Sequence, residues 1–183
     1  MHPCLLRLAG ALLILACGTA VAAQPAPTRE PAASTQARPA DEESLALVHA
    51  INLHEIALAK LALTRPAAQT TQGMASMLLK EHTRNDAAQA RLGLAPRQTP
   101  VVTALQRMQQ DEVATLTALP PDAFEKAYID AMVEGHLAAR DLLEQRAGVA
   151  RSAQVRAYLI QTRVAVEDHL SQARKLQSGA VGR

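Results

Sequence analysis

The clearest pattern of apolar and polar positions lies near the C-terminal end of the chain, at residues 155–176. Apolar or small residues recur there at alternating steps of four and three, which places them on one helix face about 100° wide. This seam consists of Val155, Leu159, Thr162, Val166, His169, Ala173 and Leu176. A single helix cannot bury such a seam, so we expect the rest of the chain to supply partner helices.

Four further segments show the same helical period, and prolines or glycines mark their ends. They predict helices at about residues 41–64, 67–92, 99–119 and 120–148. Residues with a high β propensity occur singly and never in a run of period two. The predicted fold is therefore all-α: an up-and-down four-helix bundle with an extra short connecting helix between the second and third long helices.

Residues 1–22 have the pattern of a secretory signal peptide, with Arg7 before an apolar run at residues 8–16 and small residues after it. That run is shorter than the about 20 residues a membrane-spanning helix needs, so we expect no transmembrane segment in the mature protein. Ala20-Val21-Ala22 fits ordinary signal cleavage. Residues 13–17 instead resemble a bacterial lipobox, which would end the leader at residue 16 and anchor lipid at Cys17. Both routes predict the periplasm or the outer membrane.

The remaining chain divides by composition. Residues 23–40 are rich in Pro, Ala, Ser, Thr and Gln, which predicts a disordered tether, and residues 178–183 predict a disordered tail. The bundle is thus expected at residues 41–177. Cys4 and Cys17 are the only cysteines and both lie in the leader. Disulfides and thiol-based metal sites are therefore excluded from the bundle.

Charge and aromatic content exclude one class of function. Acidic and basic residues are nearly equal in number across the predicted bundle, and the whole chain has only two tyrosines, one phenylalanine and no tryptophan. A nucleic-acid-binding protein would show a basic face, with aromatic residues on which bases stack. We expect no nucleic-acid partner.

Candidate chemistry rests on the histidines. His54, His82, His136 and His169 fall one in each long segment, near its middle. Residues near the middle of bundled helices lie at a common depth, so these four histidines could converge on one layer. The carboxylates beside them in sequence are Glu55, Glu81, Glu134 and Asp168. Imidazole with carboxylate is a ligand set for zinc, iron, manganese or copper. The alternative is that the histidines lie at the edge of the core and hydrogen-bond to neighbouring helices.

Two familiar catalytic arrangements are missing. Di-iron bundles use Glu-x-x-His, which directs both side chains at one metal, and no histidine at residues 41–177 has an acidic residue three positions before it. No Gly-x-Ser-x-Gly motif is present either. A di-iron centre is therefore not expected, and the sequence identifies no catalytic residue.

The order and spacing of four motifs resemble the family called domain of unknown function 4142. The motifs are EIALAKLA at residues 55–62, MLLKEHT at 77–83, FEKAY at 124–128 with His136 beyond it, and DHL at 168–170. The resemblance covers residues 43–176 and implies a ferritin-like bundle of the bacterial envelope, often labelled "predicted outer membrane protein", with no established activity. It maps the family's histidines onto His82, His136 and His169 and its first-helix acid onto Glu55. Glu81 stands where the family usually has Asp.

Three functional hypotheses follow. The first is a binding or envelope-stress module without catalysis, whose helix faces contact a protein partner that the sequence does not identify. The second is a protein that binds a transition metal at a mononuclear site in the bundle core. Its candidate ligands are Glu55, Glu81, His82, His136 and His169. The third is a redox enzyme of ferritin-like ancestry, which the missing Glu-x-x-His disfavours.

Overall fold

The computed structural model describes residues 38–181, all within one compact unit. The described chain forms five helices and no strand, which confirms the all-α prediction. The helices are α1 (Arg38–Leu63), α2 (Gln69–Ala90), α3 (Pro100–Ala118), α4 (Pro121–Val149) and α5 (Ala153–Val181). The predicted leader, the lipobox with Cys17 and the tether up to residue 37 lie outside the described residues.

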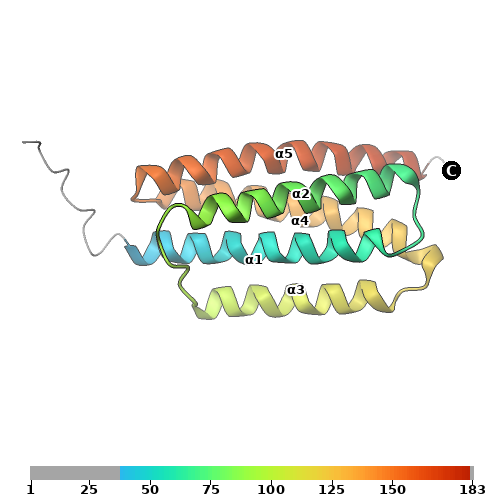
Figure 1. Cartoon of the computed structure of the whole chain (residues 1–183), viewed down its shortest axis with the longest axis horizontal. Helices are drawn as coiled ribbons and strands as arrows, with labels where there is room; N and C mark the ends of the chain where they lie inside the picture. The colour runs from blue at the N-terminus through green and yellow to red at the C-terminus, as the bar shows by residue number, and fades with distance from the viewer. Residues whose placement is uncertain (1–37, 182–183) are drawn as a thin grey trace, which may run out of the picture. The chain divides into compact units, whose positions relative to one another are not determined.

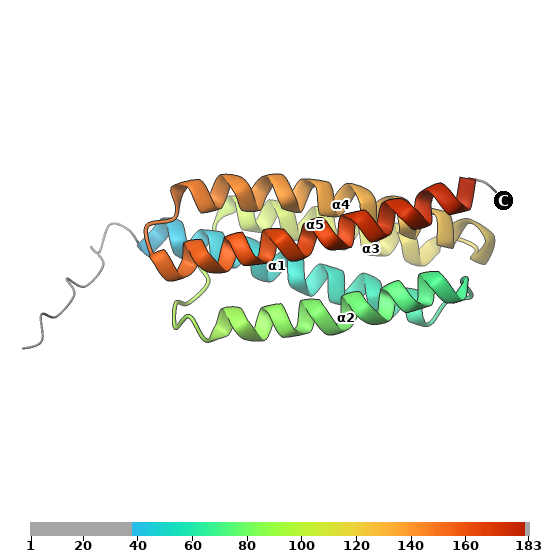
Figure 2. The same cartoon turned by 90° about the horizontal axis from the view of Figure 1, so that it is seen from above.

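Each helix reverses the direction of the one before it (Figure 1). The most extensive contacts pair α4 with α5 and α1 with α2, while α2 also contacts α5 and α1 contacts α4. These four long helices form the predicted bundle, and α3 packs outside it against α1 and α4, below the bundle in Figure 1 and behind it in Figure 2. Because α3 brings the chain back along the bundle, α2 and α4 run in the same direction.

Local sequence explains where most helices begin and end. Pro100 occupies the first turn of α3, and the Thr99 side chain accepts a hydrogen bond from the Val102 amide, a standard N-cap. Gly93, after α2, has a φ of 69°, a left-handed conformation that favours glycine. The predicted boundaries at residues 65–66 and 93–100 therefore agree with the structure.

Both ends of the bundle extend beyond the predicted limits of 41 and 177. The first helix begins at Arg38 because Pro39 fits into a first helical turn, where no amide donor is needed. The last continues to Val181, within the segment that the sequence predicted to be disordered. One contact that holds this end is the Gln177 side chain, which donates to Asp130 Oδ1 of α4 at 2.8 Å.

An acidic residue of α1 stabilises a different helix. The Asp41 carboxylate, 2% exposed, accepts hydrogen bonds from the amides of Arg151 (3.0 Å) and Ser152 (2.8 Å), just before α5. An acid at the start of a helix ordinarily complements the dipole of that same helix. Asp41 lies in the first turn of α1, but its hydrogen bonds cap the entry to α5.

The composition of α1 reflects its place in the core. Among the described helices only α1 is long and apolar enough to cross a membrane, over Pro39–Leu63 with a mean hydropathy of 1.3. More than half of that apolar window (56%) is buried inside the bundle. The helix also buries Asn52 and Glu55, two polar residues that contact other helices. Packing in the core thus accounts for its apolar character.

The apolar core divides into two main clusters with polar residues between them. One cluster holds the second half of α1, the first halves of α2 and α4 and the end of α5, with Tyr128 and Phe124 fully buried. The other holds the opposite halves of α1, α4 and α5. The buried polar residues between these clusters are Asn52, Glu55, His82, His136 and His169. This polar layer contains the candidate site.

Candidate metal centre

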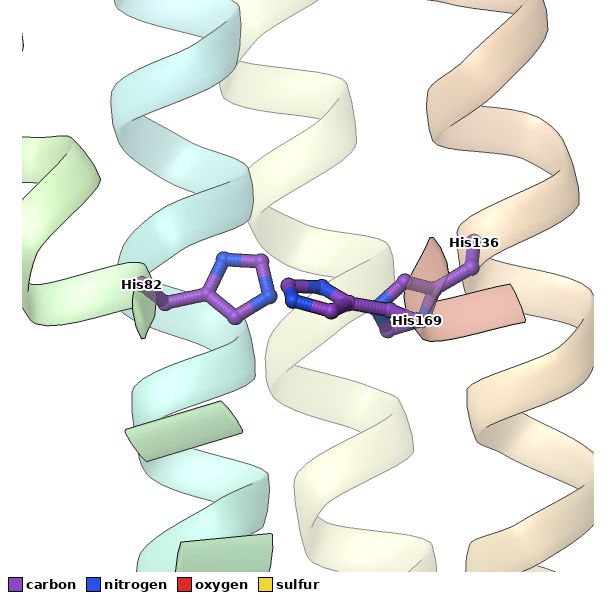
Figure 3. Close-up of side chains that lie close together, drawn as sticks. All are labelled: His82, His136 and His169. Atoms are coloured by element: carbon purple, nitrogen blue, oxygen red, sulfur yellow. The ribbon is translucent and has the colours of Figure 1, made fainter. Parts of the chain in front are cut away.

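Three buried histidines from three helices face one another in the polar layer (Figure 3). His82 comes from α2, His136 from α4 and His169 from α5, and they are 4%, 1% and 3% exposed. Their ring centroids are 5.3 to 5.8 Å apart. One nitrogen from each ring lies within 4.8 Å of the other two, so a single metal ion could contact all three.

Hydrogen bonds on the outward nitrogens orient two of the rings. His136 Nδ1 donates to the carbonyl of Met132 at 2.8 Å, and His169 Nε2 donates to the carboxylate of Glu81 at 2.7 Å. A carbonyl and a carboxylate only accept, so both protons must be on these outward nitrogens. The inward nitrogens, His136 Nε2 and His169 Nδ1, therefore carry lone pairs.

A chain of amides orients the third ring. His82 Nδ1 donates to Asn52 Oδ1 at 3.0 Å, and Asn85 donates to the same oxygen at 3.2 Å. Thr162 of α5 in turn donates to Asn85 Oδ1 at 3.1 Å. This network leaves the lone pair of His82 on Nε2. A metal-binding histidine is usually oriented in this way, by a hydrogen bond on its other nitrogen.

The inward nitrogens have no hydrogen-bond partner. His82 Nε2, His136 Nε2 and His169 Nδ1 are all buried, and none of them is within hydrogen-bonding distance of a suitable group among the described residues. Buried polar atoms are nearly always satisfied in folded proteins, and each one that is not costs about 1–3 kcal/mol. Three such atoms that face one another form a set that one bound cation could satisfy.

A carboxylate on α1 completes the layer. Glu55 is 4% exposed, its Oε1 lies 3.8 Å from His136 Nδ1, and its Oε2 has no hydrogen-bond partner. Gly135 of α4 lies beside it, and a Cβ there would make an ordinary van der Waals contact with Oε1 at 3.5 Å. Burial and the Glu55 charge also raise the pKa of Tyr128, whose buried hydroxyl has no partner either. The three convergent histidines come from α2, α4 and α5, and α1 adds a buried carboxylate beside them.

Burial favours the neutral form of two of these histidines. It lowers the pKa of His82 to about 4, a shift that Glu55 opposes and that His136 and His169 strengthen. Burial likewise lowers the pKa of His169. A neutral imidazole is the form that binds metal, so its lone pair is available at neutral pH.

The expectation that four histidines share this layer was wrong for His54. Its Nε2 instead lies 2.9 Å from Glu112 Oε2 on α3. Successive residues of a helix point about 100° apart, so His54 and Glu55 cannot both face the bundle axis. Glu134 and Asp168, also considered beside the histidines, are exposed.

The other predicted site residues divide into two roles. His82, His136 and His169 converge as expected, with Glu55 beside them. Glu81 points its carboxylate at the outward nitrogen of His169 and is therefore a supporting residue. Asn52, which orients His82, was not among the candidate site residues. The sequence feature that could have identified it is its place three residues before Glu55, on the same buried stripe of the first helix.

Comparisons with known proteins agree on the fold. A family model described as "Domain of unknown function (DUF4142)" matches residues 26–176. The crystal structure of a DUF305 fragment from Deinococcus radiodurans is similar, with a TM-score of 0.68 and 17% identity. The match covers 81% of this chain and 99% of that one, and at this identity it shows a shared fold alone. No curated protein matches the chain.

Proposed function

The chain belongs to the DUF4142 family, whose description gives no activity, and from the geometry of the polar layer we propose that it is a metal-binding protein. One transition-metal ion would be held by His82, His136 and His169, with the carboxylate of Glu55 on α1 beside them as a balancing charge. The observation that carries this proposal is the set of three inward, unpartnered nitrogens.

A water molecule does not satisfy this arrangement as well as a cation. Water has two protons to donate, whereas three acceptor nitrogens face the centre, so at least one nitrogen would stay unpaired. Protonation of a ring would supply one donor, but burial lowers the pKa of both His82 and His169. A metal ion accepts all three lone pairs at once.

The donor set limits which metal fits. Three imidazoles suit zinc, copper, iron or nickel, and the described bundle contains no cysteine. The charges of Glu55 and Glu81 would balance a divalent ion. A second metal has no comparable ligand set here: among the described residues only these three histidines form a metal-ligating group. The proposed centre is therefore mononuclear.

Location is a separate proposal. The pattern of residues 1–22 supports export to the periplasm or outer membrane, with Cys17 as the lipid anchor if the lipobox is used. The mass of the protein isolated from its native membrane fraction would distinguish the two processing routes. A lipid-modified Cys17 at the N-terminus would support the anchor, and an N-terminus at residue 23 would support ordinary cleavage.

Elemental analysis of the untagged, purified protein tests the metal proposal. We expect about one equivalent of a transition metal, and almost none in a His82→Gln, His136→Gln or His169→Gln variant. His54→Gln is the matched control, because His54 lies on the same bundle but contacts α3, and it should keep the metal. A protein that takes up no metal even after reconstitution would contradict the proposal and favour a binding module without metal.

A supporting residue gives an independent test. Glu81→Gln keeps an oxygen that accepts the His169 proton but removes the negative charge that makes this imidazole a stronger ligand. Loss of such an outer partner typically weakens metal binding about 10- to 100-fold, and the conservative change should fall at the low end. Glu134→Gln removes an equal charge from an exposed position and should leave the affinity unchanged. Equal affinities of the two variants would contradict this role of Glu81.

A further inference from the structure

A pocket between α2 and α5 reaches the histidine centre from one side of the bundle. Its volume is about 290 Å³, and two of the three convergent histidines, His82 and His169, form part of its wall. Glu81 also lines it, and its side chain is 40% exposed. Solvent in this pocket therefore comes close to two rings of the centre, whose inward nitrogens are themselves buried.

The opposite side of the bundle is arranged differently. There α3 packs against α1 and α4, and the larger groove of about 670 Å³ between these helices is lined by Glu55 but by none of the three histidines. Glu55 thus approaches the centre from the α1 side, while the pocket approaches it between α2 and α5. A ligand from solvent and Glu55 would occupy different positions around the ion.

The chemistry of the pocket favours a small anion. Arg84 lies on its wall, is exposed, and forms no ion pair with any described residue. Glu81, the other charged residue of the wall, accepts a hydrogen bond from His169, and its negative charge faces the same pocket. Gln161 and Thr162 add polar groups, and a volume of about 290 Å³ is room for roughly ten waters, so a small anion fits in it. An anion in the pocket would be attracted both by the Arg84 guanidinium on the wall and by the metal ion beyond His82 and His169.

Building on the proposed metal site, we propose that the bound ion has an open coordination position on the α2–α5 side, which takes a small inorganic anion in place of water. Three histidines with an open position are the ligand set of catalytic rather than structural metal sites. The centre would then bind an external ligand as well as the ion itself.

The experiment uses cobalt(II) as the metal and azide as the anion. Visible absorption of cobalt(II) changes with its ligands and coordination number, so azide titrated into the cobalt-loaded protein should produce a saturable spectral change. Ala165→Leu fills the pocket from α5 without removing a ligand. We expect it to bind one cobalt and to lose azide affinity at least tenfold. Arg84→Gln should weaken azide binding several-fold and reduce its dependence on salt.

Ala138→Leu is the matched control, since it adds the same side chain to the groove beside α3. It should bind cobalt and azide as the parent protein does. Bound cobalt whose spectrum azide does not change would overturn this inference and leave the metal site standing. Unchanged azide binding in Ala165→Leu would overturn the route between α2 and α5. A protein that binds no cobalt would contradict both proposals.

Discussion

Each imidazole of the centre is fixed by one hydrogen bond on the nitrogen that points away from it. For His136 the partner is a carbonyl of its own helix, whereas His82 and His169 rely on side chains of neighbouring elements. These bonds set the tautomers and leave three lone pairs directed inward. The residue types needed for this were visible in the sequence, but the pairing of Asn52 with His82 spans 30 residues and required the fold.

We predict that the metal-free protein loses stability as the pH falls, because one buried histidine resists protonation. The pKa of His82 is lowered from 6.5 to about 4, mainly by burial. Between these pH values the unfolded chain binds a proton that the folded chain does not, so the free energy of unfolding falls as the pH falls through this window. The His82 contribution is fully present above pH 6.5 and amounts to roughly 3 kcal/mol.

Urea unfolding of the metal-free protein at several pH values measures this effect. The groups that face His82 across the layer are Glu55, Glu81, His136 and His169, and the lowered pKa of His169 adds to the same trend. His82→Gln should therefore show a smaller loss of stability on acidification than the parent protein. An unfolding free energy that stays constant between pH 6.5 and 4 would show that His82 is not held neutral.

At the scale of elements, most helices follow from local sequence, and their attachment to one another does not. Prolines and glycines predicted the ends of α2, α3 and α4 to within a few residues. The cap of α5 depends on Asp41, which lies 111 residues before Ser152 in the chain. From neighbouring residues alone, Asp41 could be assigned only to the start of its own helix. The partner of His54 could not be predicted either, since Glu112 lies on α3.

Asp41→Asn tests the contact between α1 and the start of α5. The asparagine keeps one acceptor oxygen, so one of the two amide hydrogen bonds is lost together with the negative charge beside a helix N-terminus. We expect the free energy of unfolding to fall by about 1–2 kcal/mol. Asp122→Asn, in the first turn of α4 and exposed, should change it by less than about 0.5 kcal/mol. Similar values for both variants would contradict the capping role.

At the scale of the whole molecule, a polar layer separates two apolar clusters inside one bundle. The three inward nitrogens there are unpaired when no ion is bound, so this layer destabilises the metal-free fold. A bound ion would remove that cost. Folding and metal binding are therefore expected to be coupled in this protein.

Thermal unfolding with and without metal measures the coupling. An ion that binds the folded chain alone stabilises it by about 2.7 kcal/mol when its free concentration is a hundred times Kd. We expect the Tm to rise with added metal and to return to its original value with a chelator. His136→Gln, which removes one convergent ring, should show little rise. A Tm that the metal leaves unchanged in the parent protein would contradict the coupling.

The sequence by itself determined the all-α fold, the order of the helices and the histidines His82, His136 and His169, because helical periodicity and proline positions are local properties. It also placed Glu55 among the candidate ligands. The tertiary structure decided which residue of α1 faces the layer, which partners orient the rings, and which pocket His82 and His169 line. These features depend on how helices rotate about their own axes and pair across the bundle, and only the packed structure sets that rotation.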